Sequence, residues 1–432
     1  MITRIEAYAY RCFPTLSVDL GPFHLLAGAN GAGKTTLLDI PVLLGDLIGQ
    51  QRVADAFLRP QDSRSTPRAH TLTELVHRER GKSIMFTIEA GLPADIVNTM
   101  AGRSAPSTTE QTPTHLRYEL RLDIFNYELQ VAAEYLFLFP DVERRRPKAG
   151  IRLQGAEHAS RRALPQRAWQ WVISRDRGEP TAFTTETTTR GPRLPPIGVP
   201  VTQLSLGAVP ADPGLFPAAL WFAQLLREGA VFFDPDWAGL RQAAAPGDPV
   251  RLLPSGRNLP WLVRSLQQVD PDRFALWVDH VRTALPQIEA IDAIEREEDH
   301  YAYLAVTYAG GYRVTSSGLS EGTLRILTLT LLPYLPTAAM PRLLVTEEPE
   351  NGIHPRAIET VVQSLSALPD SQVWVSTQSP LVLADVDLDQ VLAARLDADG
   401  SVTVIPGREH PQLRDWHGSI DLGTLFAAGV LS

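Results

Sequence analysis

Two adjacent glutamates, Glu347 and Glu348, follow a short run of residues that favour a β-strand, Leu343-Leu344-Val345. Two like charges side by side repel each other, and placing either beside a core without a counter-ion is costly. The pattern therefore predicts that a cation binds where this strand ends. A charged turn after an edge strand is the alternative, and it explains one acid more easily than two.

A glycine-rich segment near the N-terminus supplies chemistry that suits such a cation. Residues 28–36 read GANGAGKTT and fit the spacing G-x-x-x-x-G-K-[ST], between a strand-like run, FHLLA, and an apolar helix-like run, TTLLDI. In this strand–loop–helix context, the backbone N–H groups around Gly28, Gly31 and Gly33 turn inward around a phosphate. Lys34 would reach the β- and γ-phosphates of ATP, and Thr35 would offer its hydroxyl to Mg²⁺. We assign nucleotide contacts to Asn30, Gly31, Ala32, Gly33, Lys34, Thr35 and Thr36.

The two motifs complement each other. In P-loop sheets of this kind a neighbouring parallel strand delivers an acid to the Mg²⁺ shell, and ligands collect at the carboxyl ends of the strands. Glu347 would face the metal, and Glu348 would lie near the γ-phosphate, where it orients or deprotonates the attacking water as a general base. We therefore predict Thr35 and Glu347 as metal ligands and Glu348 as a catalytic residue.

Two further segments lie near these carboxylates in the sequence. Residues 318–327 read GLSEGTLRIL, where Ser320 and Gly322 are small residues at the start of a predicted helix, so that a hydroxyl and free N–H groups offer a second anion site. Taken alone, this pattern is that of a helix N-cap. Residues 372–380 read QVWVSTQSP, a predicted central strand that ends in Thr377-Gln378.

In this order the motifs resemble those of the OLD/RecF/Rad50-like ATPases of the ABC superfamily, the AAA_21 and AAA_15 types. The resemblance is carried by LSEGT, close to the family signature LSGGQ, by EEPENGIHP at residues 347–355, and by the N-terminal strand pair MITRIEAYAYRCFPTLSVDL. It implies that Ser320, Glu321 and Gly322 of one protomer close over the ATP held by another, so that the protein forms a homodimer or higher homo-oligomer. It also implies that residues 351–354 are the D-loop, which crosses this interface.

The same resemblance places Gln378 where the family has a switch histidine, usually within T-H-S-P. A glutamine amide donates a hydrogen bond to the γ-phosphate or to water, but it neither carries positive charge nor relays a proton. We therefore predict Gln378 as a catalytic residue and expect slow hydrolysis. The alternative is that this position tolerates any hydrogen-bond donor.

The predicted fold class is α/β, and the resemblance implies an ABC-type ATPase head. This head combines a P-loop sheet with flanking helices and an antiparallel β lobe, and a compact, mostly helical insertion interrupts it. The predicted domains are an N-terminal ATPase lobe over residues 1–174, a loop and helical insertion over residues 175–294, and a C-terminal ATPase lobe over residues 295–432.

Local signals predict several elements of this fold. Alternating segments such as HLRYELRLDIFNYELQV predict strands between residues 71 and 172. Pro217 and Pro271 predict helix starts, and Gly310-Gly311 predicts the turn of a hairpin. Pro41 predicts that the phosphate-loop helix bends or ends at the residue before it.

The composition predicts a protein of the cytoplasm. The chain has 432 residues, a formal net charge of −9 and a single cysteine, Cys12, which fits a reducing compartment. No stretch approaches the roughly 18 apolar residues that span a bilayer, and the N-terminus lacks the apolar block of a signal peptide, so we expect no membrane contact. Eight cations between Arg144 and Arg167 interrupt the acidic background, and they suit DNA, an acidic partner protein or a solvated loop.

Two functions remain open. In the first, an ATP-gated sensor or scaffold holds a separate effector, a nuclease or Toprim-like protein, as in the ATPase subunits of bacterial anti-phage defence systems. In the second, a DNA-coupled ATPase serves recombination or repair. Few residues follow the predicted switch strand, so we expect no nuclease domain in this chain. We favour the first function, because slow turnover at Gln378 suits a long-lived ATP-bound dimer.

Overall fold

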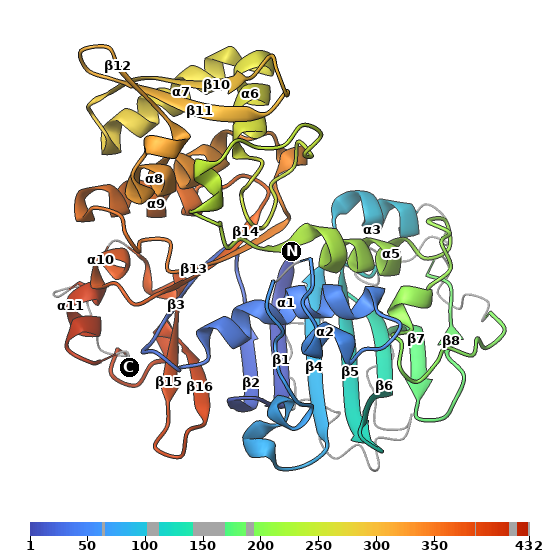
Figure 1. Ribbon diagram of the computed structural model, residues 1–432. Coiled ribbons are helices and arrows are strands. Elements are labelled where there is room, and N and C mark those ends of the chain that lie inside the picture. The colour runs from blue at the N-terminus through green and yellow to red at the C-terminus, as the bar shows by residue number, and fades with distance from the viewer. Residues whose placement is uncertain are drawn as a thin grey trace. The chain divides into compact units, whose positions relative to one another are not determined.

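The computed structural model describes residues 1–62, 65–101, 112–140, 169–186, 194–384, 386–413 and 421–430 (Figure 1). The chain forms two compact units. The antiparallel unit comprises Met1–Gly21, Asp39–Gly229 and Leu396–Val404, and the phosphate-loop unit comprises Pro22–Leu38, Ala230–Arg395 and Ile405–Ser432. Each compact unit combines separate stretches of the chain, so this division does not test the predicted domain ranges. The ranges 1–174, 175–294 and 295–432 therefore stay predictions.

A seven-stranded antiparallel sheet forms the centre of the antiparallel unit. Its side chains alternate with the period of two that a strand imposes, so Ile5, Phe86 and Leu120 share one face and Glu6 and Glu119 the other. The N-terminal strand pair and the strands predicted between residues 71 and 172 are confirmed, whereas β8 lies in a stretch that was predicted to be a loop. In sheet order the strands are β2 (Phe13–Asp19), β1 (Ile2–Tyr10), β4 (Ser83–Gly91), β5 (His115–Phe125), β6 (Glu128–Phe139), β7 (Gln170–Asp176) and β8 (Ala182–Phe183).

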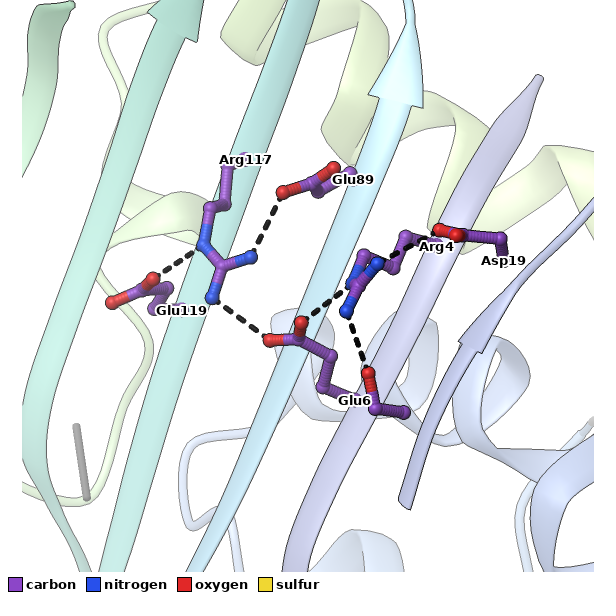
Figure 2. Close-up of polar contacts among 7 residues, drawn as sticks. Arg4, Glu6, Asp19, Glu89, Arg117 and Glu119 are labelled. Atoms are coloured by element: carbon purple, nitrogen blue, oxygen red, sulfur yellow. Dashed lines mark hydrogen bonds and ion pairs between the residues drawn. The ribbon is translucent and has the colours of Figure 1, made fainter. Parts of the chain in front are cut away.

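The second face of this sheet carries a network of charges whose centre is buried (Figure 2). The guanidinium of Arg117 bonds the carboxylates of Glu6 and Glu89, each at 2.8 Å, and also that of Glu119. All four side chains are buried. The network, which we call the sheet ion network, joins strands β1, β2, β4 and β5, and it consists of Arg4, Glu6, Asp19, Glu89, Arg117 and Glu119.

Helix α1 (Lys34–Gly49) begins in the phosphate-loop unit and continues into the antiparallel unit. The predicted end of this helix just before Pro41 is wrong. Val42, Leu43, Leu44 and Leu47 are buried, and burying such side chains, at about 1.5–3 kcal/mol each, outweighs the roughly 3 kcal/mol that a proline costs inside a helix. The antiparallel unit also contains α2 (Asp55–Leu58), α3 (Ala94–Ala101), α5 (Pro217–Gln224) and a π-helix, Leu225–Gly229.

A parallel sheet organises the phosphate-loop unit, in which β3 pairs with β15 and β14, and β13 pairs with β14 and β9. Alternation again sets the faces: Leu25, Leu344 and Val373 all reach one hydrophobic core. The edge strand β9 was not predicted, because three apolar residues carry no period. In sheet order the strands are β16 (Val402–Pro406), β15 (Val391–Leu396), β3 (Phe23–Ala27), β14 (Gln372–Thr377), β13 (Leu343–Glu347) and β9 (Ala230–Phe232).

Helices and a three-stranded sheet complete this unit. The predicted helix starts are confirmed at Pro271 in this unit and at Pro217 in the antiparallel unit. Asp270 caps the helix that starts at Pro271 by accepting a backbone N–H at 3.0 Å. The predicted hairpin turn is also confirmed, with φ of 86° at Gly310 and 80° at Gly311. No helix among the described residues has the length and apolar character needed to cross a membrane. The elements are α6 (Leu259–Val269), α7 (Pro271–Ala284), β10 (Ile288–Glu295), β11 (Ala302–Tyr308), β12 (Tyr312–Thr315), α8 (Glu321–Leu331), α9 (Pro355–Ser366), α10 (Pro380–Leu383) and α11 (Leu422–Ala427).

Candidate nucleotide site

The phosphate loop connects the buried strand β3 to the first turn of α1. Gly31 and Gly33 have φ of 79° and 71°, the left-handed region that a side chain disfavours. Gly28 is required for a different reason than the predicted one, because a Cβ there would lie 2.3 Å from the carbonyl oxygen of Ala394 on β15. Two of the three glycines therefore shape the loop, and Gly28 allows the chain to pack closely against β15.

The other predicted nucleotide contacts occupy distinct places on this loop. Asn30 is exposed, whereas Ala32 is buried and donates its N–H to the carbonyl of Ala29 at 3.2 Å. Thr36 is half-buried in the first turn of α1. Asn30 and Gly31 are thus exposed residues of the loop, as is Ala29.

Lys34 begins α1 and is buried. Its Nζ donates hydrogen bonds to the carbonyl oxygens of Gly28 and Ala29, at 2.8 and 2.9 Å. The ammonium group therefore lies within the loop that is predicted to hold the phosphates. Burial lowers the pKa of Lys34, and nearby carboxylates, those of Glu348 and Glu347 first among them, act in the opposite direction.

Thr35 and Glu347, the two predicted metal ligands, are in contact. The hydroxyl of Thr35 donates a hydrogen bond to Oε1 of Glu347. Strand β13 lies between β14 and β9, so it is not an edge strand, and the alternative of a charged turn after an edge strand does not hold. A hydroxyl and a carboxylate oxygen suit Mg²⁺, which in phosphate sites is bound by one or two protein groups together with phosphate and water. In the described part of the chain, no three His, Cys, Asp or Glu residues could hold a metal by themselves.

Glu348 is fixed at both its backbone and its side chain. Its φ is 43°, and its N–H donates to the carbonyl of Ser376 at 2.9 Å. The side-chain amide of Asn351 donates to Oε2 at 2.8 Å, and that of Gln378 donates to Oε1. The structure thus brings the predicted base into contact with the residue at the predicted switch position.

Glu350 and Thr377 are two neighbours of this site that the sequence did not single out. Glu350 is 7% exposed, and its Oε1 accepts a hydrogen bond from the hydroxyl of Thr377 at 2.5 Å. Burial raises the pKa of Glu350, while the bond from Thr377 lowers it. The third acid in EEPE, Glu350, was the available signal, because a carboxylate that is buried needs a specific hydrogen-bond partner.

The predicted signature residues start helix α8. Ser320 caps it by accepting the N–H of Thr323 at 3.2 Å, as an N-cap does. Glu321 is exposed and pairs with Arg325 at 2.7 Å. Gly322 permits close packing on the predicted D-loop, because a Cβ there would lie 2.7 Å from the carbonyl oxygen of Gly352. Within one chain, the signature therefore packs against the predicted D-loop at Gly352.

The predicted basic segment from Arg144 to Arg167 lies outside the described residues. The phosphate loop, Glu347, Glu348 and Gln378 come together at the carboxyl ends of three neighbouring parallel strands, β3, β14 and β13, whereas the signature residues lie at the start of α8. This is the position at which open α/β sheets bind ligands. Loop N–H groups, an ammonium, a hydroxyl and carboxylates form a donor set that fits a nucleoside triphosphate with Mg²⁺.

Comparison with known families adds a second line of support for an ATPase-type domain. The AAA_21 model, described as "AAA domain, putative AbiEii toxin, Type IV TA system", matches residues 227–384. This range extends from the π-helix to α10, so it includes Ser320, Glu347, Glu348 and Gln378 but not the phosphate loop. The OLD nuclease of Thermus scotoductus (strain ATCC 700910 / SA-01) is 40% identical over 63 residues. That match spans 14% of this chain and only 11% of the OLD nuclease.

Several solved structures of SMC heads are also similar to this chain. Each is 12% identical in sequence, and each match covers 94% of this chain. One is an SMC head bound to the C-winged helix domain of ScpA, with a TM-score of 0.48 and 96% of that chain covered. Another is the SMC head with an extended coiled coil, bound to the C-terminal domain of ScpA derived from Pyrococcus furiosus, with a TM-score of 0.43 and 95% of that chain covered. A third is the SMC head domain from Thermotoga maritima, with a TM-score of 0.39 and 98% of that chain covered. At this identity the similarities say nothing about activity.

The α/β fold class is confirmed by the sheets themselves. The resemblance to AAA_21-type ATPases is confirmed over the matched range, and the OLD nuclease is a distant relative. ATPases of this class use ATP with Mg²⁺. Over residues 227–384, this chain is therefore similar to the AAA_21 family of ATPase domains.

Proposed function

We propose that this protein binds ATP with Mg²⁺, hydrolyses it slowly, and acts in the cytoplasm as an ATP-gated sensor or scaffold for a separate effector in anti-phage defence. The observation that supports slow hydrolysis is the contact between Gln378 and Glu348. A neutral amide stands where the resembling ATPases have a histidine, so the site has a hydrogen-bond donor there but no group that carries a proton.

The described residues suggest how each side chain contributes. Lys34 would exchange its bonds to two loop carbonyls for bonds to phosphate oxygens. Thr35 and Glu347 would hold Mg²⁺, which neutralises charge on the phosphates when it is bound. Glu348 would accept the proton of the attacking water, while Asn351 and Gln378 hold its carboxylate in a fixed direction.

This arrangement favours long occupancy over rapid cycling. Without a protonated group at position 378, charge that develops on the γ-phosphate lacks one source of stabilisation. An ATP-bound state that persists is suited to holding a partner. We propose a homodimer or higher homo-oligomer with ATP at its interface, closed by Ser320, Glu321 and Gly322, and a nuclease or Toprim-like effector on another chain. A contact of the Arg144 to Arg167 segment with DNA belongs to the alternative function, a DNA-coupled ATPase.

Steady-state ATP hydrolysis by the purified full chain, with and without double-stranded DNA, tests this proposal. Glu348→Gln serves as the blank, and equilibrium binding of ATP is measured in parallel. We expect tight ATP binding, turnover only slightly above the blank, and no stimulation by DNA. Brisk turnover that DNA raises would overturn the scaffold in favour of the DNA-coupled ATPase, and absence of ATP binding would overturn both.

A further inference from the structure

The hydroxyl of Thr377 makes two hydrogen bonds that hold the loop carrying Gln378. The Oγ1 of Thr377 donates to Oε1 of Glu350 at 2.5 Å and accepts the backbone N–H of Ser379 at 3.0 Å. One side chain thus bonds the residues on both sides of Gln378 into a single arrangement. It also joins this loop, which follows β14, to the loop that follows β13.

Glu350 is well placed to hold this loop. It is 7% exposed and Thr377 is 0% exposed, so water does not compete for their hydrogen bond, and such bonds are stronger in a buried setting. The backbone of Glu350 is itself held, since its carbonyl accepts the N–H of Ile353 at 3.1 Å. Its other carboxylate oxygen, Oε2, is buried and has no hydrogen-bond partner among the described residues.

Glu350 and Glu348 lie two residues apart on one loop, and each bonds the loop of Gln378. Glu350 bonds Thr377 and Glu348 bonds the Gln378 side chain. The backbone adds a third connection, from the N–H of Glu348 to the carbonyl of Ser376 at 2.9 Å. The bond between Glu350 and Thr377 therefore restricts where the Gln378 amide lies relative to the Glu348 carboxylate.

We infer that Glu350 and Thr377 are positioning residues for ATP hydrolysis, which act by holding the Gln378 amide against Glu348. This inference rests on the proposed function, since it assigns a role in the same reaction. Neither residue needs to touch ATP. Loss of their hydrogen bond would leave nucleotide affinity unchanged and slow the chemical step.

Single-turnover ATP hydrolysis with enzyme in excess measures even a slow chemical step. Thr377→Val removes the hydroxyl at nearly constant volume, and Thr377→Ser restores it. We expect the rate to fall about tenfold in the valine variant and to return to within about threefold in the serine variant, with the Kd for ATP unchanged in both. Thr330→Val is the matched control, because Thr330 is also buried and hydrogen-bonded, to the carbonyl of Ile326, but lies at the far end of α8. We expect it to lower stability and leave the rate unchanged.

A double variant separates positioning from general damage. If Thr377 acts through the amide, Thr377→Val has no further effect on the rate in a Gln378→Ala background. Additive losses would overturn the inference, because Thr377 would then act independently of Gln378. An unchanged rate in Thr377→Val would also overturn it.

Amide hydrogen exchange supplies a readout that needs no hydrolysis. The N–H of Ser379 is bonded to the Thr377 hydroxyl, so we expect its exchange to rise about tenfold in Thr377→Val and Glu350→Ala, and little in Thr377→Ser. Equal protection in all variants would overturn the inference. These results stay distinguishable from failure of the proposed function, because that function fails when the wild-type protein binds no ATP or turns it over briskly.

Discussion

The side-chain amide of Gln378 donates a hydrogen bond to Oε1 of Glu348, and that of Asn351 donates to Oε2 at 2.8 Å. Both oxygens of the carboxylate at the end of β13 are therefore held by neutral donors from two different loops. A neutral donor fixes the direction of a carboxylate without adding positive charge beside it. This pair is the physical basis for expecting a base that is well oriented but a reaction that is slow.

Gln378→His should speed hydrolysis. The imidazole keeps a donor toward Glu348 and, when protonated, adds the charge and the proton that the amide lacks. We expect the single-turnover rate to rise at least about tenfold, and more at pH 6 than at pH 8, because the unperturbed pKa of histidine is about 6.5. The measurement is the rate of ATP hydrolysis across that pH range.

Gln378→Ala is the control for this substitution. It removes the donor without adding charge, so its rate should fall below that of the wild-type protein. Equal rates for the histidine variant and the wild-type protein, both above the alanine variant, would contradict the idea that the missing charge limits turnover. They would instead support the alternative that this position tolerates any hydrogen-bond donor.

Gly28→Ala should damage the fold rather than the turn of the phosphate loop. Its Cβ would lie 2.3 Å from the carbonyl oxygen of Ala394, whereas a Cβ at Gly31 meets nothing within 4 Å. We expect Gly28→Ala to lose about 1–3 kcal/mol in the free energy of unfolding, as overpacking does. Gly31→Ala should lose about 1 kcal/mol through its φ of 79° alone. Urea unfolding of both variants checks this order, and a reversed order would contradict it.

Local patterns in the sequence predicted much of this structure, and contacts between distant segments account for what they missed. The phosphate loop and the strand before Glu347 are local, since spacing and alternation within about ten residues define them. The bond between Thr377 and Glu350 joins residues 27 positions apart, which no local period records. The helix that continues through Pro41 is likewise stabilised by buried contacts rather than by propensity.

The sheet ion network is another feature that only the folded chain reveals, since Arg117 and Glu6 are 111 residues apart (Figure 2). Arg117→Met would leave three glutamates, Glu6, Glu89 and Glu119, buried without this cation. Breaking a buried ion pair from one side typically costs about 3–5 kcal/mol, so we expect a loss of this size in the free energy of unfolding. Chemical denaturation of the full chain measures it.

Arg121→Met is the matched control for Arg117→Met. Arg121 lies on the same strand and pairs with Asp123 at 2.9 Å, but 22% of its side chain is exposed. Water compensates such a pair in part, so we expect a loss of about 1 kcal/mol or less. Similar losses for the two variants would mean that burial of the Arg117 carboxylate partners carries no special cost.

Glu186 should make stability depend on pH. This buried carboxylate accepts the N–H groups of Ala218 and Ala219 at 2.6 and 2.9 Å, at the start of α5. Burial raises its pKa from 4.5 to about 7, and the two N–H groups lower it by less. Because the folded protein binds this proton more tightly than the unfolded chain, the contribution to stability is complete below pH 4.5 and is lost as the pH rises through 7.

Glu186→Gln isolates this contribution, since glutamine does not titrate. We expect the wild-type protein to lose on the order of 3 kcal/mol relative to Glu186→Gln between pH 4.5 and pH 8, the equivalent of the shift from 4.5 to about 7. Urea unfolding of both proteins at several pH values gives this difference directly, because titration of all other groups cancels. A difference that stays constant with pH would show that Glu186 keeps an ordinary pKa, and that the N–H groups of α5 compensate its burial in full.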